Sequence, residues 1–124
     1  GYGAQHSPSG NTTFPTTTAV NQTSVGHQSG QNTATQIDGI TTIGYRATAG
    51  AVNGTSLGIL SRADHTDSVA LGSNTVTTAA NQVMVGPRDV EITDATKGLV
   101  LKSPDGSRFR ISVDNAGVLS AAKI

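Results

Sequence analysis

The fold of this chain is decided by residues 53–72, which read NGTSLGILSRADHTDSVALG. The first six and the last six residues of this stretch follow one pattern. Each begins with a turn-forming residue, Asn53 or Asp67, and each ends with an aliphatic residue followed by glycine. The second copy therefore repeats the first at a period of 14. Such self-similarity predicts a stacked architecture in which each short unit packs on its neighbours.

The same pattern continues in both directions along the chain. An aliphatic residue precedes glycine at five places, and the steps from one glycine to the next are 18, 14, 14 and 14 positions: Val25-Gly26, Ile43-Gly44, Leu57-Gly58, Leu71-Gly72 and Val85-Gly86. Five positions before these glycines stand turn formers: Asn21, Gly39, Asn53, Asp67 and Asn81. The longer first step predicts an inserted loop near residues 30–39.

A unit of this length is too short for two helices, and its Thr, Val, Ala, Gly and Ser favour extended backbone. We expect two short strands and two tight turns per unit, with coils stacked about 4.8 Å apart in parallel sheets. Ala and Val would fill the interior, while Ser and Thr, Thr75 among them, would face water. The aliphatic residues would form an uncovered stripe, which a homotrimer would bury around its axis. The predicted trimer core is Val25, Ile43, Leu57, Leu71 and Val85.

The repeat resembles the head repeat of YadA-type trimeric autotransporter adhesins, which many phage tail fibres share. The resemblance rests on residues 21–29 (NQTSVGHQS), 40–47 (ITTIGYRA) and 67–74 (DSVALGSN), and it covers roughly residues 19–92. It implies a left-handed parallel β-roll of three chains side by side. The sequence departs from the family pattern in its long first step, in the apolar Ile59-Leu60, and in Pro87, where the array is expected to end. The alternative is a left-handed helix of hexapeptides, whose period of 18 fits only the first step.

The two ends of the chain follow other patterns. Residues 1–18 are broken by Pro and Gly, which predicts an extended or capping segment. Residues 93–124 predict an antiparallel three-strand meander, with strands at about 99–103, 107–113 and 117–121. Turn signatures separate these strands at 103–106 (SPDG) and 114–117 (DNAG), and Arg108 and Arg110 are expected on the solvated face. The meander resembles short β-modules that end or interrupt phage tail fibres and tailspikes.

The composition restricts the functions open to this chain. Val, Ile, Leu and Phe make up 26 of its 124 residues, which predicts too thin a core for an ordinary globular enzyme. Eight basic residues balance eight acidic ones, which argues against nucleic-acid binding, and no apolar run is long enough for insertion into a membrane as a helix. Because the first residue is Gly, we expect the chain to be a fragment, a processed product or a tagged protein, whose function is shared with a longer parent.

Few residues indicate chemistry beyond the repeat. His27, Tyr45 and Arg46 follow repeat glycines by one or two positions, so we expect them at equivalent edges of successive coils, where they could contact a sugar. The alternative is that they are ordinary solvated turn residues. Residues 64–67 (DHTD) combine metal-ligand types within one short turn, and we expect no metal there. With no Cys, serine triad, ordered carboxylate pair or phosphate-binding glycine motif, we predict no cofactor and no enzymatic activity.

Together these features predict a non-enzymatic, trimeric segment of a phage tail fibre or tailspike, located in the virion, that presents a rigid tip to the host cell. Repetition would give stiffness, threefold closure would give avidity, and the partner would be a host surface glycan or protein receptor. Two alternatives stay open. One is the head of a bacterial trimeric adhesin at the cell surface. The other is the trimerisation module of a glycan-degrading tailspike whose active site lies elsewhere.

Overall fold

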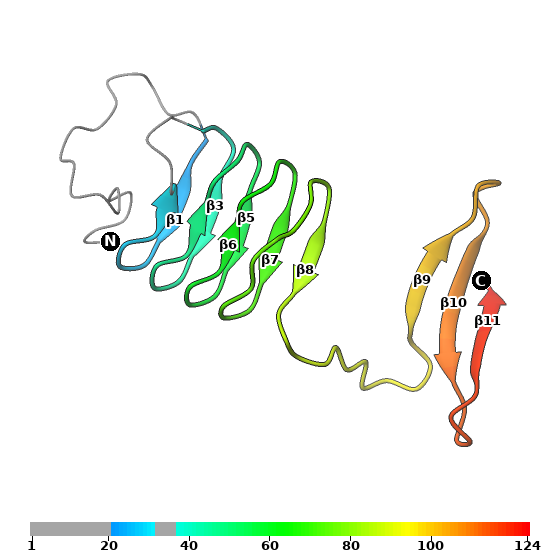
Figure 1. The fold of residues 1–124 in the computed structure, drawn as a ribbon. Coiled ribbons are helices and arrows are strands. Elements are labelled where there is room, and N and C mark those ends of the chain that lie inside the picture. Colours follow the sequence, from blue (N-terminus) through cyan, green and yellow to red (C-terminus); the bar gives the residue numbers. More distant parts are fainter. Residues whose placement is uncertain (1–20, 32–36) are drawn as a thin grey trace. The chain divides into compact units, whose positions relative to one another are not determined.

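The chain folds as an all-β protein in two compact units that divide after Arg88 (Figure 1). The structure is a computed structural model that describes residues 21–31 and 37–124. Every regular element in these residues is a β-strand, as the composition predicts. The expected extended segment 1–18 lies outside the described residues, and so does the middle of the expected inserted loop.

The first unit is a parallel β-solenoid of about four turns. Its larger sheet has five strands, in the order β1 (Thr23–Val25), β3 (Thr41–Ile43), β5 (Thr55–Leu57), β7 (Val69–Leu71) and β8 (Val83–Val85). Its smaller sheet has three strands, in the order β2 (Gly30–Gln31), β4 (Thr48–Ala49) and β6 (Arg62–Ala63). An isolated bridge from Arg62 to Val76 extends the smaller sheet by one more coil.

The strand register confirms the predicted repeat period of 14. Residues of β3, β5 and β7 pair with residues 14 positions further on, as Thr42 does with Ser56. The offset is 18 both between β1 and β3 and between β2 and β4, where Gly30 pairs with Thr48. The four additional residues therefore lie between Gln31 and Thr41, where the inserted loop is predicted. Because each coil contributes two strands rather than three, the hexapeptide helix is excluded.

Both turns of each coil need unusual backbone conformations. The predicted turn formers are all left-handed, with φ between 54° and 71°: Asn21, Gly39, Asn53, Asp67 and Asn81. The second turn is also left-handed, with φ between 53° and 58°, at Gln28, Arg46, Leu60 and Asn74. The sequence does not reveal these second positions, because they share no residue type. Between the two turns the repeat glycines stack so closely that a Cβ on Gly44 would lie 2.6 Å from the carbonyl oxygen of Gly58.

The interior of the solenoid corrects one prediction. Alanine does fill it, as expected, but valine does not, and seven Ser and Thr side chains are also buried: Ser29, Thr42, Ser56, Ser61, Ser68, Thr75 and Thr77. The expectation that Thr75 faces water is wrong, since its side chain is 2% exposed. Two strands of two or three residues enclose a narrow space, in which Ile40 is the one large aliphatic side chain that is fully buried among the described residues. A short hydroxyl fits there, because it can donate to a carbonyl of its own coil, as Ser61 does to Gly58 at 2.8 Å and Thr75 to Leu71 at 2.9 Å.

One interior hydroxyl among the described residues has no hydrogen-bond partner, and this leads to a stability prediction. The Oγ of Ser56 is buried without a hydrogen-bond partner, and the next coil has Ala70 at the paired position. A buried unsatisfied hydroxyl costs about 1–3 kcal/mol. We therefore expect Ser56→Ala to raise the thermal unfolding midpoint by a few degrees in a calorimetric scan.

Ser61→Ala is the matched control, because it removes a hydroxyl that is bonded to the carbonyl of Gly58. This variant should lower the same midpoint. Equal losses of stability in the two variants would mean that the Ser56 hydroxyl has a partner, and would contradict the prediction.

The second unit, residues 89–124, contains the expected antiparallel meander. Its strands are β9 (Leu99–Lys102), β10 (Arg108–Val113) and β11 (Leu119–Lys123), in the order β11-β10-β9. The third strand begins two residues later than predicted, because the Asp114 carboxylate accepts hydrogen bonds from the amides of Ala116 and Val118, both at 2.9 Å, which lengthens the turn. All of residues 89–124 are described, and none of them is buried.

The hairpin between β9 and β10 is closed by a carboxylate. Asp105 accepts hydrogen bonds from the amide of Ser107 at 2.9 Å and from the hydroxyls of Ser103 and Ser107. The Ser103 hydroxyl contributes most to holding the pKa of Asp105 below its ordinary value, and the Ser107 amide and hydroxyl add to it. Asp105 thus supports the turn in its ionised form, and this support is lost as the pH falls through its lowered pKa.

Candidate functional site

The outer face of the five-stranded sheet carries the aliphatic residues that precede the repeat glycines. Thr42, Ser56 and Ala70 are buried at the middle of their strands, so the residues on either side point outward. The register aligns the predicted core residues in one row, which we call the apolar row: Val25, Ile43, Leu57, Leu71 and Val85. Their exposed fractions run from 38% at Ile43 to 54% at Val25, and Leu71 is half-buried. In the part of the chain that the structure describes, no element covers this row.

A second outward row runs beside the apolar row on the same face, and the sequence analysis missed it. It consists of Thr23, Thr41, Thr55, Val69 and Val83. The row is polar in the first three coils and becomes apolar in the last two, where Val83 is 65% exposed. The exposed apolar surface is therefore one row wide at β1 and two rows wide at β7 and β8. The alternation in Val69-Ala70-Leu71 and Val83-Met84-Val85 is the signal that could have revealed it.

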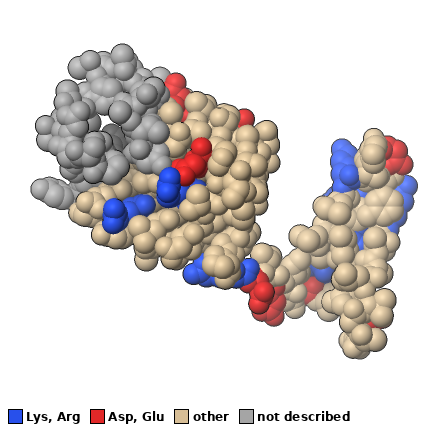
Figure 2. Space-filling view, viewed as in Figure 1, with Lys and Arg blue, Asp and Glu red and all other residues tan. Residues whose placement is uncertain are grey.

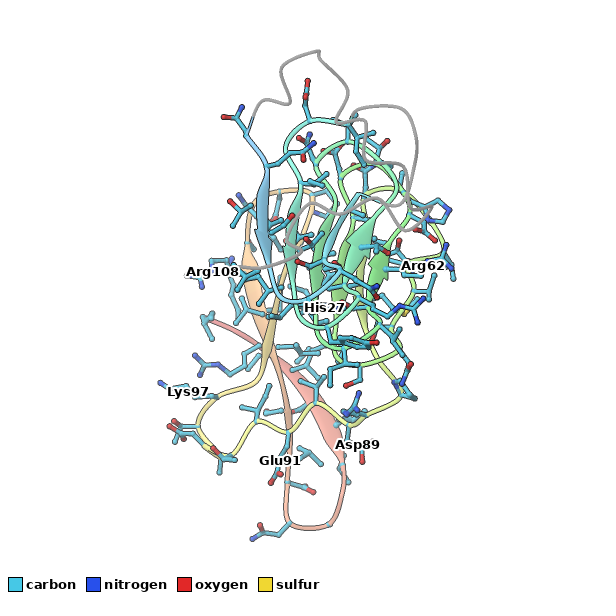
Figure 3. All side chains as sticks on the ribbon, turned by 90° about the vertical axis from the view of Figure 1, so that its left-hand side faces the viewer. His27, Arg62, Asp89, Glu91, Lys97 and Arg108 are labelled. Atoms are coloured by element: carbon cyan, nitrogen blue, oxygen red, sulfur yellow. The ribbon has the colours of Figure 1, made fainter. Side chains whose placement is uncertain are left out.

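Two of the three predicted ligand-contacting residues meet at the turn that follows the larger sheet. The rings of His27 and Tyr45 stack with centroids 5.7 Å apart and an interplanar angle of 9°. The turn backbones hold this spacing, because the Arg46 amide donates to the His27 carbonyl at 3.0 Å and the Leu60 amide to the Tyr45 carbonyl at 2.9 Å. Figure 3 labels His27 at this turn. Ile59, 52% exposed, occupies the equivalent position in the next coil.

Arg46 does not belong to this stack. It occupies the left-handed position one residue after Tyr45, with φ of 53°, and its side chain is exposed. The structure thus places the rings of His27 and Tyr45 together beside Ile59. Arg46 is next to Tyr45 in the chain but is not part of the stack. An exposed pair of parallel rings offers an apolar surface on which a sugar ring could stack.

The smaller sheet lies on the opposite side of the solenoid and carries few charges. In Figure 3, the label of Arg62 and the blue strand β1 lie on opposite sides. Arg62 forms an ion pair with Asp64, at 2.6 Å between Nη2 and Oδ2. Figure 2 shows that charged atoms are sparse over the solenoid on the face in view.

In the turn 64–67, each of the residues that could bind a metal ion interacts with a different partner. Asp64 pairs with Arg62, the Nδ1 of His65 lies 3.3 Å from the Thr77 hydroxyl, and Asp67 accepts a hydrogen bond from the Asn53 amide group at 2.8 Å. Within residues 21–31 and 37–124, no three His, Cys, Asp or Glu side chains gather to hold a metal ion. Nor does any helix in these ranges have the length and hydropathy to cross a membrane.

The meander has two unlike faces, because residues directly opposite one another in antiparallel strands share a face. Its apolar face consists of Leu99, Leu101, Phe109, Ile111, Val113, Leu119 and Ala121, with Lys123 at one corner. Leu99, Leu101, Val113 and Leu119 are each at least 56% exposed. The expectation that Arg108 and Arg110 share the other, solvated face agrees with the register, although Arg110 is half-buried.

Comparison with family models, with curated proteins and with solved structures finds no match for this chain.

Proposed function

We propose that this chain is a non-enzymatic, trimeric segment of a phage tail fibre or tailspike, which holds three chains in register and presents a rigid tip to the host surface. The observation that carries the proposal is the apolar row on the larger sheet. A soluble chain that remained single would leave five aligned aliphatic side chains in water. Contiguous exposed apolar surfaces of this kind mark sites of association.

The energetics favour burial of the row between copies. Burying a Val, Leu or Ile side chain completely stabilises by about 1.5–3 kcal/mol. Because four residues of the row are 38–54% exposed in the single chain and Leu71 is less exposed, burial between copies would add roughly 1 kcal/mol for each of the four and less for Leu71. The row lies on one side of the solenoid, so rotational symmetry can bring the rows of all copies to a common axis.

The meander supports the same proposal independently. Its apolar face carries Phe109, Ile111 and five further apolar residues, yet none of residues 89–124 is buried. A three-stranded sheet gains stability when its apolar face is removed from water. Association of copies would cover this face as well as the apolar row. Each of the two units would then contribute one surface to the interface between copies.

The number three and the phage context come from the sequence resemblance. The YadA-type head repeat implies three chains side by side, and the meander resembles modules of phage fibres and spikes. The alternatives, a bacterial adhesin head and an assembly module of a glycan-degrading tailspike, share the same trimer. The sequence that flanks this chain in its parent separates them, because an anchor domain, a depolymerase or a virion-attachment segment would each be recognisable.

The experiment that tests the proposal is a mass measurement of the folded protein by native mass spectrometry or by sedimentation. We expect one species containing three of the 12.5 kDa chains. A species of one 12.5 kDa chain at micromolar concentration, with a circular dichroism spectrum rich in β-structure, would overturn the proposal. The measurement needs no ligand and is therefore independent of what the tip binds.

A further inference from the structure

Three cationic residues lie together on the face of the meander opposite to its apolar face. Lys102 of β9 and Arg108 of β10 are directly opposite one another in the register, and Arg110 follows Arg108 on the same face. We call Lys102, Arg108 and Arg110 the basic face. Figure 2 shows Lys and Arg atoms gathered near the end of this unit where β9 and β10 join. The sequence separates Lys102 from the arginines by a turn, so only the strand register reveals the group.

Lys102 and Arg108 form no ion pair within the described chain, where the only salt bridge joins Arg62 to Asp64 in the other unit. Asp105 of the turn between them carries a negative charge, but its carboxylate accepts hydrogen bonds from the Ser103 and Ser107 hydroxyls and the Ser107 amide instead of pairing with either cation. Like charges directly opposite one another in a sheet are destabilising, so this pair costs stability in the absence of an anion.

The third cation is different, because it has an acidic neighbour. Asp94 lies near enough to Arg110 for the guanidinium to contribute to the lowering of the Asp94 pKa, after the larger effect of hydrogen bonds from Thr96. Arg110 is also half-buried, and its Nε is buried without a hydrogen-bond partner. Arg110 thus lies partly buried at the centre of the sheet with an acidic neighbour, while Lys102 and Arg108 are exposed beside it.

Hydroxyl groups continue the basic face along β10. Ser112 and Ser120 are paired in the register, and their Oγ atoms lie 3.2 Å apart. From Arg108 to Ser112 the strand advances about 14 Å, at roughly 3.4 Å per residue. The face therefore offers cations followed by hydroxyls along the open surface of a sheet. That arrangement suits an extended polymer with charged and hydroxyl groups better than a small enclosed ligand.

We propose that the basic face binds an anionic polysaccharide, one that carries carboxylate or phosphate groups along its length. The Arg108 guanidinium can pair with such a group in a bidentate manner, and Lys102 contributes a second charge beside it. The proposal deepens the proposed function by naming a ligand class for a receptor-binding segment. One copy alone would bind weakly because the charges are exposed to salt, whereas three copies of the face would multiply the avidity.

The test measures binding of the full chain to immobilised alginate, a polymer of uronic acids, and to poly(glycerol phosphate), with neutral dextran as the reference surface. We expect binding to both anionic polymers and none to dextran, and at least tenfold weaker binding in 500 mM than in 50 mM salt. The double variant Lys102→Gln with Arg108→Gln should lose at least tenfold in affinity. It should also keep or raise its thermal unfolding midpoint, because it removes a repulsive pair.

The matched control is the double variant Lys97→Gln with Lys123→Gln, which makes the same change in net charge away from the basic face. Lys97 precedes the meander, and Lys123 lies on the apolar face opposite Phe109. This control should bind the polymers within about twofold of the unaltered chain. A loss of binding equal to that of the first variant would overturn the proposal, and so would a loss of stability in the first variant.

Other outcomes identify other ligands or sites. Equal or tighter binding to single-stranded DNA or to phosphatidylserine vesicles would overturn the choice of a polysaccharide. Binding that survives in the basic-face variant and is lost in Tyr45→Ala would assign the ligand to the His27–Tyr45 stack instead. The mass of the assembly, measured on the same samples, keeps the two proposals distinct: a trimer without binding refutes only the basic face, and binding by single chains refutes only the trimer.

Discussion

Replacing Leu71 by aspartate is expected to abolish the trimer. Leu71 lies in the apolar row between Leu57 and Val85, where it would be buried in all three copies. The change forfeits at most about 1 kcal/mol of interface burial per copy and places an unpaired carboxylate in the interface, which costs several kcal/mol more. Native mass spectrometry should show single or unfolded chains in place of three.

This result distinguishes the trimer from a single chain sharply. In the single chain Leu71 is partly exposed, so a monomer would lose only its partial burial, roughly 1–2 kcal/mol, and the aspartate carboxylate would still reach water. Asn74→Asp is the control, because Asn74 is exposed and its left-handed backbone also suits aspartate. The control should stay trimeric. A Leu71→Asp protein with an unchanged mass and unfolding midpoint would refute the assignment of the apolar row to the interface.

The second large effect is expected from Gly44→Asn, which should prevent the solenoid from folding. Gly44 has a φ of 133°, a region that side chains rarely adopt, at a cost of about 1–3 kcal/mol. Its new Cβ would also lie 2.6 Å from the carbonyl oxygen of Gly58, which belongs to the backbone of the next coil. The coils would have to separate and lose the bond of 2.9 Å from the Gly58 amide to the Ile43 carbonyl. A total of about 4 kcal/mol or more approaches the stability of a small domain.

Gly39→Asn is the matched control for this prediction, since it introduces the same side chain five residues earlier. Gly39 is left-handed with a φ of 71°, and its counterpart in the next coil is already an asparagine, Asn53. Its Cβ would clash with the Oδ1 of Asn53, at the end of a side chain that can move, and would be in ordinary contact with the Asn53 Cα at 3.5 Å. We expect circular dichroism and thermal melts of this variant within about 1 kcal/mol of the unaltered protein. Similar unfolding in both variants would contradict the role assigned to the glycine stack.

Much of the fold could be predicted because the repeat places residues with special backbone conformations at regular intervals along the chain. The turn formers from Asn21 to Asn81 and the glycines from Gly26 to Gly86 fix where the chain reverses, and the period of 14 then dictates parallel stacking. The contents of the coil were harder to predict. Thr75 is buried and Thr23 is exposed, although both are threonines. Which of them lies inside depends on how many side chains fit between two very short strands, and residue type does not show this.

The candidate surfaces also divide into those that the sequence predicts and those that only the structure shows. The apolar row and the positions of His27 and Tyr45 follow from the repeat, whereas the basic face depends on how β9 and β10 pair across a turn.

By itself, the sequence determined the length of the coil, the site of the first turn in each coil and the all-β class, since these depend on backbone conformations that glycine, asparagine and aspartate adopt most cheaply. Only the tertiary structure decided which hydroxyls lie inside, which two rings stack, and which cations face one another. These outcomes depend on register and on the space between strands, which are properties of residues distant in the chain and close only after folding.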